Sequence, residues 1–129
     1  MSPDPSLPPA AERDAAAQDL AWMARVKQGD EAALQALIEA HQHRIIGTVA
    51  KMLGDSGDAE DIAQQVFIRV WKSAARYEPT AKFTTWLFKI TRNLVFNELR
   101  RRKRHPAQSL DAAAFHDDDR PMQVADHTV

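Results

Sequence analysis

Apolar residues recur at helical spacing through the middle of the chain, and no segment shows the alternation typical of a half-buried strand. The pattern predicts a short first helix that Asp19 caps and Gly29 ends, followed by a second helix capped by Asp30. The inward positions of the second helix are Leu34, Leu37, Ile38, His41, Ile45, Val49, Met52 and Leu53. The glycine-rich segment 54–57 then ends that helix.

Two further helices are predicted downstream. The third covers residues 58–76, with Asp58 as its cap, and the fourth is capped by Thr84 or Thr85 and runs to Arg104. Four helices joined by short loops predict an all-α fold, a compact bundle of about four helices.

The two ends of the chain lack this pattern. Residues 1–17 are rich in Pro and Ala and are predicted to form a flexible tail, whereas residues 105–129 are small and acidic and are predicted to be a flexible linker. The segment that is expected to fold is therefore residues 18–104, a size that fits one modest domain.

The charge of the chain is unevenly distributed, although its net value is −1. Residues 89–104 carry seven Lys or Arg and one Glu, a net charge of +6, and residues 105–129 carry a net charge of −4. A basic segment of this kind is either a solvated helix face or the electrostatic signature of nucleic-acid binding.

Several classes of function are disfavoured. The chain has no Cys, so disulfides and thiolate chemistry are excluded, which suits a reducing cytoplasm. There is no apolar run of about 18 residues, so no membrane span is expected. His41 and His43 lie two residues apart and diverge on a helix, and no catalytic carboxylate pair is recognisable. We therefore predict no enzyme activity, no cofactor and no metal.

The third helix has an apolar side and a polar side. Its core stripe is predicted to be Ala59, Ile62, Ala63, Val66, Phe67, Val70 and Ala74. The opposite arc holds Glu60, Asp61, Gln64, Gln65 and Lys72, together with two large apolar residues, Ile68 and Trp71. Trp71 either packs on a neighbouring loop or is the anchor of a protein-docking face whose acidic rim selects a basic partner.

The fourth helix has a broad apolar face that contains Leu87, Phe88, Ile90, Leu94, Val95 and Leu99. The remaining arc carries Trp86, Lys89, Asn93, Asn97, Arg100 and Arg104, with Phe96 at its edge. Each Asn is either a solvated helix position or, beside the cations, a group that reads a base edge. In the preceding loop, Tyr77, Lys82 and Phe83 either anchor the loop or help to hold a single strand.

Three motifs in order give this chain a specific resemblance over residues 19–104. They are the segment 26–33 (VKQGDEAA), the segment 57–67 (GDAEDIAQQVF) followed by Trp71, and the segment 82–93 (KFTTWLFKITRN). Together they resemble region 2 of bacterial sigma-70-family transcription initiation factors of the extracytoplasmic function (ECF) group.

The resemblance implies two binding surfaces in the cytoplasm. Core RNA polymerase would bind, through the clamp helices of its β′ subunit, to Asp61, Gln64, Gln65, Ile68 and Trp71. The promoter −10 element would bind through its single-stranded non-template strand, with one flipped base at Asn93. The residues expected to contact DNA are Tyr77, Lys82, Lys89, Asn93, Asn97, Arg100, Arg101, Lys103 and Arg104. An anti-sigma protein that covers the same faces is a further expected partner.

The chain departs from the family pattern in three ways. Gln65 and Asn97 stand where acidic residues are common, and the second domain of the family, the helix-turn-helix of region 4, does not follow the linker. We therefore expect a fragment of a longer factor rather than a natural one-domain relative. The alternative function is a helical adaptor that binds only protein partners.

Overall fold

The computed structural model describes residues 9–105, which form a helical bundle. The helices are α1 (Ala10–Val26), α2 (Glu31–Leu53), α3 (Ala59–Ser73) and α4 (Phe83–Arg104), and a short 3₁₀ turn over Ala74–Arg76 follows α3. Residues 9–105 contain no strand, so the predicted all-α class is confirmed. Each helix in this range is too short or too polar to cross a bilayer.

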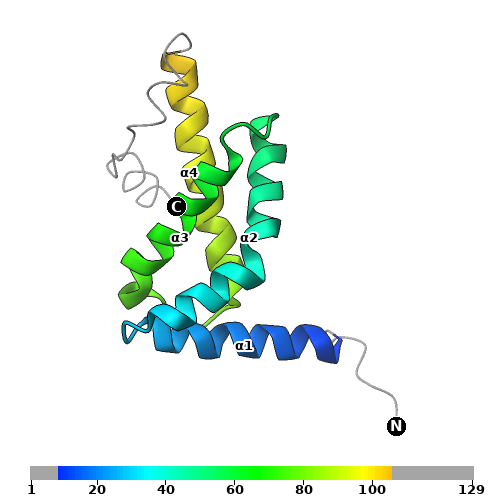
Figure 1. Ribbon diagram of the computed structural model, residues 1–129, viewed down its shortest axis with the longest axis vertical. Helices are drawn as coiled ribbons and strands as arrows, with labels where there is room; N and C mark the ends of the chain where they lie inside the picture. The colour runs from blue at the N-terminus through cyan, green and yellow to red at the C-terminus, as the bar shows by residue number, and fades with distance from the viewer. Residues whose placement is uncertain (1–8, 106–129) are drawn as a thin grey trace.

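The arrangement of the helices is shown in Figure 1. The long helix α4 runs along the molecule and packs against the other three helices, while α1 lies crosswise at one end of the bundle. The turn between α2 and α3 lies beside the C-terminal half of α4 (Figure 1), where it is held by ion pairs to Arg102. Because α4 is covered from several sides, a larger part of its surface is buried than a single apolar stripe would suggest.

The first helix begins earlier than predicted. It starts at Ala10, within the segment expected to be a tail, because this segment is rich in Ala, the strongest helix former. Residues 10–18 are nevertheless exposed except for the half-buried Ala16, and the buried part of α1 begins at Asp19. The prediction that Asp19 caps the helix was wrong, because Asp19 lies inside α1 and points to another helix.

The helix ends agree with the sequence prediction at some positions and not at others. Asp30 caps α2 as predicted, since its carboxylate accepts a hydrogen bond from the Ala33 amide at 3.2 Å. That bond, with the nearby Arg25, lowers the pKa of the Asp30 carboxyl below its ordinary value. Gly54 ends α2 in the left-handed conformation with φ +82°, which favours glycine.

The predicted cap of α3 is right in position but not in its hydrogen bond, and the predicted cap of α4 was wrong. Asp58 precedes α3 but makes no side-chain cap hydrogen bond, because its carboxylate binds Arg102 instead. Helix α4 begins at Phe83 after Lys82, so Thr84 and Thr85 lie inside the helix rather than before it. Phe83, the first residue of α4, is 1% exposed.

The core follows the predicted stripe of α3, since all seven residues of that stripe are buried. On α2 a single ridge of residues four apart is buried, which consists of Ala33, Leu37, His41, Ile45 and Val49. The adjacent ridge of Leu34, Ile38 and Ile46 is only partly buried. Helix α2 therefore leaves apolar surface beside the core.

A buried polar pair joins α1 to α2. The Nε2 atom of His41 lies 2.9 Å from Oδ1 of Asp19, and both side chains are less than a tenth exposed. Nδ1 of His41 has no hydrogen-bond partner within the described residues, and the ring lies 5.7 Å from that of Phe83. Asp19 is therefore the partner of Nε2 of the buried imidazole, and this bond links α1 to α2.

We predict that Asp19→Ala lowers the free energy of unfolding by about 1–3 kcal/mol, because it leaves a buried imidazole nitrogen without its partner. Chemical denaturation of the full chain measures the change. The matched control is Asp14→Ala, an exposed position on the same helix, for which a change within about 0.5 kcal/mol is expected. Equal losses in the two variants would contradict a structural role for the Asp19–His41 pair.

Candidate functional site

A groove of about 760 Å³ runs between α2 and α3. Its α2 side is formed by Glu31, Leu34, Gln35, Ile38, Gln42 and Ile46, and its α3 side by Glu60, Ala63, Gln64, Phe67, Ile68 and Trp71. The partly buried ridge of α2 therefore forms one wall of the groove, and the outer arc of α3 forms the other. The groove can receive an elongated apolar element such as a helix.

Two large apolar side chains on α3 are exposed at this groove. Ile68 is 52% exposed and Trp71 is 36% exposed, and both side chains line the groove. The charged groups that line the groove are Glu31 and Glu60, and no Lys or Arg lines it. An apolar surface with an acidic rim is electrostatically complementary to a basic partner.

The residues predicted for protein docking lie together on the outer arc of α3. Asp61, Gln64, Ile68 and Trp71 are exposed and Gln65 is half-buried, and three of the five line the groove. Sequence reasoning missed the contribution of α2. The signal was present, because Leu34, Ile38 and Ile46 form a second apolar ridge one residue away from the buried one.

The loop before α4 is held by buried aromatic rings. Tyr77 is 4% exposed, and its ring centroid lies 4.9 Å from that of Trp86 and 6.2 Å from that of Phe83. Burial, and then the charge of Asp19, raise the pKa of the Tyr77 hydroxyl. Lys27 on the loop after α1 donates a hydrogen bond to the Tyr77 carbonyl at 2.7 Å. This placement agrees with the interpretation in which Tyr77 anchors the loop. Lys82, in the same loop, is exposed.

The two asparagines of α4 are not solvated. Asn93 is 9% exposed and Asn97 is 7% exposed, because α4 packs against three other helices. The Asn97 side-chain oxygen accepts a hydrogen bond from Arg100, one turn further along the helix. Both amides lie at the margin of the exposed arc rather than at its centre.

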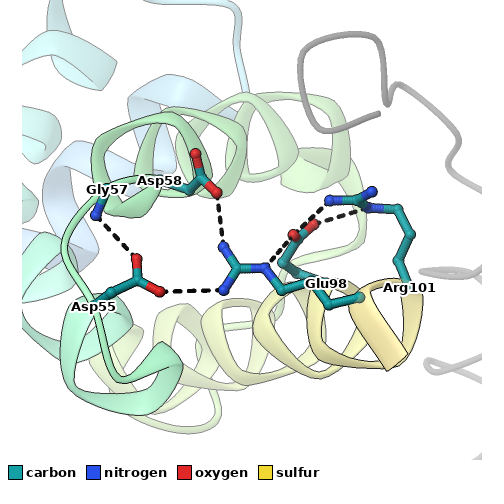
Figure 2. A network of polar contacts seen from close by, with 6 residues as sticks. Asp55, Gly57, Asp58, Glu98 and Arg101 are labelled. Carbon is teal, nitrogen blue, oxygen red and sulfur yellow. Dashed lines mark hydrogen bonds and ion pairs between the residues drawn. The ribbon is translucent and has the colours of Figure 1, made fainter. Parts of the chain in front are cut away.

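A network of ion pairs engages two of the basic residues near the end of α4 (Figure 2). Arg101, 6% exposed, donates two hydrogen bonds to Glu98, at 3.1 and 2.6 Å. Arg101, which the sequence predicted to contact DNA, is thus a buried guanidinium held by a carboxylate.

Arg102 is the centre of this network. It donates hydrogen bonds to Glu98 at 2.8 Å, to Asp55 at 3.2 Å and to Asp58 at 2.7 Å. Asp55 also accepts a hydrogen bond from the Gly57 amide at 3.0 Å (Figure 2). Burial opposes the charge of Arg102, yet the bonds with Glu98 and Asp55 outweigh burial and raise the pKa of the guanidinium. The network therefore fixes the turn before α3 to α4.

The remaining cations of α4 lie along one side of the helix. Arg92, Arg100, Lys103 and Arg104 are exposed, and Lys89 is half-buried. Phe96 lies among them and is 47% exposed. We call Lys89, Arg92, Phe96, Arg100 and Lys103 the cationic stripe. Sequence reasoning did not select Arg92 or Phe96, although the spacings of four and seven residues were visible.

No metal site accompanies these surfaces. Within residues 9–105, no group of three or more His, Asp or Glu residues is placed to hold a metal ion. The predicted linker over residues 106–129 lies outside the described residues, as do residues 1–8 of the predicted tail.

Comparison with known protein families matches residues 37–105 to the family described as sigma-70 region 2. The chain belongs to this family. The match covers more than half of the chain and includes α2 from Leu37 onward, the whole of α3 and the cationic stripe. The suspected resemblance to an ECF-type sigma region 2 is therefore confirmed. Sigma factors are not enzymes, in agreement with the prediction for this chain.

Individual relatives support the assignment to sigma region 2. The chain is 34% identical over 92 residues to the RNA polymerase sigma-H factor of Pseudomonas aeruginosa, covering 71% of this chain and 48% of that protein. It is 36% identical over 88 residues to the ECF RNA polymerase sigma factor SigW of Bacillus subtilis, covering 68% and 46%. The chain thus spans about half the length of these curated relatives.

A solved structure has the same fold. It is an NMR structure of an engineered region 2 of sigmaE in complex with GTAAAA, with a TM-score of 0.63 and 31% sequence identity. The similarity covers 67% of this chain and 90% of that one.

We predict that Arg102→Ala lowers the free energy of unfolding by at least about 1 kcal/mol, because it removes hydrogen bonds to three carboxylates. The loss should shrink in concentrated salt, since part of the network is accessible to solvent. Urea denaturation at low and high salt measures both effects. Lys103→Ala is the control, an exposed neighbour on the same helix, and a comparable loss there would contradict the role of the network.

Proposed function

We propose that this chain is the part of an ECF sigma factor that binds core RNA polymerase and recognises the promoter −10 element, acting in the cytoplasm as a transcription initiation factor. The observation that carries the proposal is the presence of two chemically different surfaces on one bundle. One is the apolar, acidic-rimmed groove of α2 and α3, and the other is the cationic stripe of α4. A protein that joins a polymerase to DNA needs both.

The groove is the proposed polymerase surface. Trp71 and Ile68 provide apolar contact area, and aromatic anchors of this kind often dominate the binding energy of an interface. Glu60 at the groove and Asp61 beside it supply the negative rim. We propose the clamp helices of the β′ subunit as the occupant. An anti-sigma protein that competes for the same groove is the proposed regulator.

The exposed side of α4 and the preceding loop form the proposed DNA surface. Lys82, Lys89, Arg100, Lys103 and Arg104 would hold phosphates of the non-template strand, because cations without base-edge geometry position a strand rather than read it. Asn93 and Asn97 would contact a flipped base from the margin of this surface. Tyr77 and Arg101 act indirectly, since the first anchors the loop and the second is held by Glu98.

The free energies of base extrusion and base stacking indicate whether this domain could open duplex DNA without the polymerase. Extruding a base from a duplex costs about a few kcal/mol, and stacking it on an aromatic side chain returns about 1–3 kcal/mol. Because these values nearly cancel, the isolated domain captures a strand that is already open. Melting of the promoter then requires the polymerase, which supplies further contacts to DNA.

We predict weak, salt-sensitive binding of the full chain to single-stranded DNA and little binding to the corresponding duplex. The hexamer GTAAAA, bound by the related sigmaE structure, and a pool of random single strands are suitable probes. Fluorescence anisotropy at several salt concentrations should give a slope of about −0.7 for each phosphate contact. Tight duplex binding, or no dependence on salt, would contradict the proposed DNA surface.

Two substitutions distinguish a residue that reads a base from a residue that holds a phosphate. Asn93→Ala should relax the preference at one base position, whereas Arg104→Ala should weaken binding to all sequences alike and reduce the salt slope by about 0.7. If the chain binds no single-stranded DNA yet still binds polymerase, the adaptor function is the correct one.

We predict that Trp71→Ala weakens binding to core RNA polymerase by about tenfold or more, because loss of a hot-spot side chain typically costs about 2 kcal/mol. The fold should remain, since the ring is more than a third exposed, and circular dichroism checks this. Phe96→Ala is the matched control, an exposed aromatic residue on another helix. Unfolding of the Trp71 variant would show that the ring serves packing instead.

A further inference from the structure

Phe96 is an exposed aromatic residue away from the groove. Within the described residues, the exposed large apolar side chains are Ile68, Trp71 and Phe96, and the first two belong to the groove. Phe96 is 47% exposed on α4, where it contributes to neither the core nor the groove. An exposed ring becomes informative when cations surround it, because aromatic side chains within a positively charged surface are how proteins hold single nucleic-acid strands.

The neighbours of Phe96 on the helix are cations. Arg92 and Arg100 lie four residues before and after it, and Lys89 and Lys103 lie seven residues before and after it. At 3.6 residues per turn, these four side chains and Phe96 share one face of α4. The ring is therefore the centre of the cationic stripe, with positive groups on both sides along the helix axis.

No carboxylate of α4 offsets this positive charge. Glu98 is the sole acidic residue of α4, and it is buried and bonded to Arg101 and Arg102. The stripe is complementary to a polyanion that also offers flat apolar surfaces. A single nucleic-acid strand has both properties, because its bases are unpaired and its phosphates recur on either side of each base.

We propose that Phe96 is a stacking platform for an unpaired base of the bound strand, with Arg92 and Arg100 on the phosphates that flank this base. The proposal rests on the proposed function and deepens it, since it adds a base contact distinct from Asn93. Duplex DNA is a poor ligand for such a platform, because its bases are already stacked on one another. The platform therefore favours the open strand over the closed duplex.

The experiment compares variants of the full chain that change only the ring. Phe96→Ala and Phe96→Leu should each weaken binding to single-stranded GTAAAA by about 5- to 150-fold, as expected for loss of one base–aromatic stack. Phe96→Tyr should bind like the unchanged chain. The salt slope should stay the same in all three, whereas Arg92→Gln should reduce it by about 0.7.

A fluorescent base analogue locates the stack. With 2-aminopurine in place of each adenine in turn, the unchanged chain should quench the fluorescence at one position most strongly, and Phe96→Leu should abolish that quenching. Ile68→Ala is the control, because it removes an exposed apolar side chain from the groove and should alter neither affinity nor quenching.

Other results would contradict the proposal that Phe96 stacks on a base. If Phe96→Leu binds as tightly as the unchanged chain while Arg92→Gln binds more weakly, the stripe holds phosphates without stacking, and the proposed function stands without the platform. If Phe96→Ala weakens polymerase binding and leaves DNA binding unchanged, Phe96 is a protein anchor. If the unchanged chain binds no single strand, both the platform and the proposed DNA surface fail.

Discussion

The ion pairs of Arg102 determine how the two proposed surfaces are placed relative to each other. They join α4 to Asp55 and Asp58, residues that lie 47 and 44 positions earlier in the chain, in the turn that leads into α3. Helix α3 forms one wall of the groove, and α4 carries the cationic stripe. One guanidinium thus holds the start of the groove helix against the helix proposed to contact DNA, and the shared core maintains the rest of their arrangement.

Local patterns in the sequence were sufficient to predict much of the fold. The stripe of α3, the Asp30 cap and the glycine at the end of α2 each depend on neighbouring residues, so their spacing predicts them. The start of α1 was missed because the absence of core positions was given more weight than the high helix propensity of Ala. The exposure of Ile68 and Trp71 was also predictable, since both stand opposite a complete core stripe.

Other differences between expectation and structure come from contacts between residues that are far apart in sequence. Asp58 occupies the cap position of α3, but Arg102 engages its carboxylate. Tyr77, which the sequence placed in a loop expected to contact DNA, is enclosed by Trp86 and Phe83. The basic run near the end of α4 likewise looks uniformly available. Its charges are divided between Arg101 and Arg102, which are held by carboxylates, and the residues of the exposed arc. Net charge alone therefore overstates how many phosphates this segment can neutralise.

The first two turns of α1 differ from the rest of the bundle in what holds them. In residues 10–18 only Ala16 is even half-buried, whereas Asp19, Met23 and Val26 further along are buried. Backbone hydrogen bonds without buried apolar area give little resistance to local opening. Amide protons in this stretch therefore exchange with solvent through fraying of the helix end, while those beyond Asp19 require the bundle itself to open.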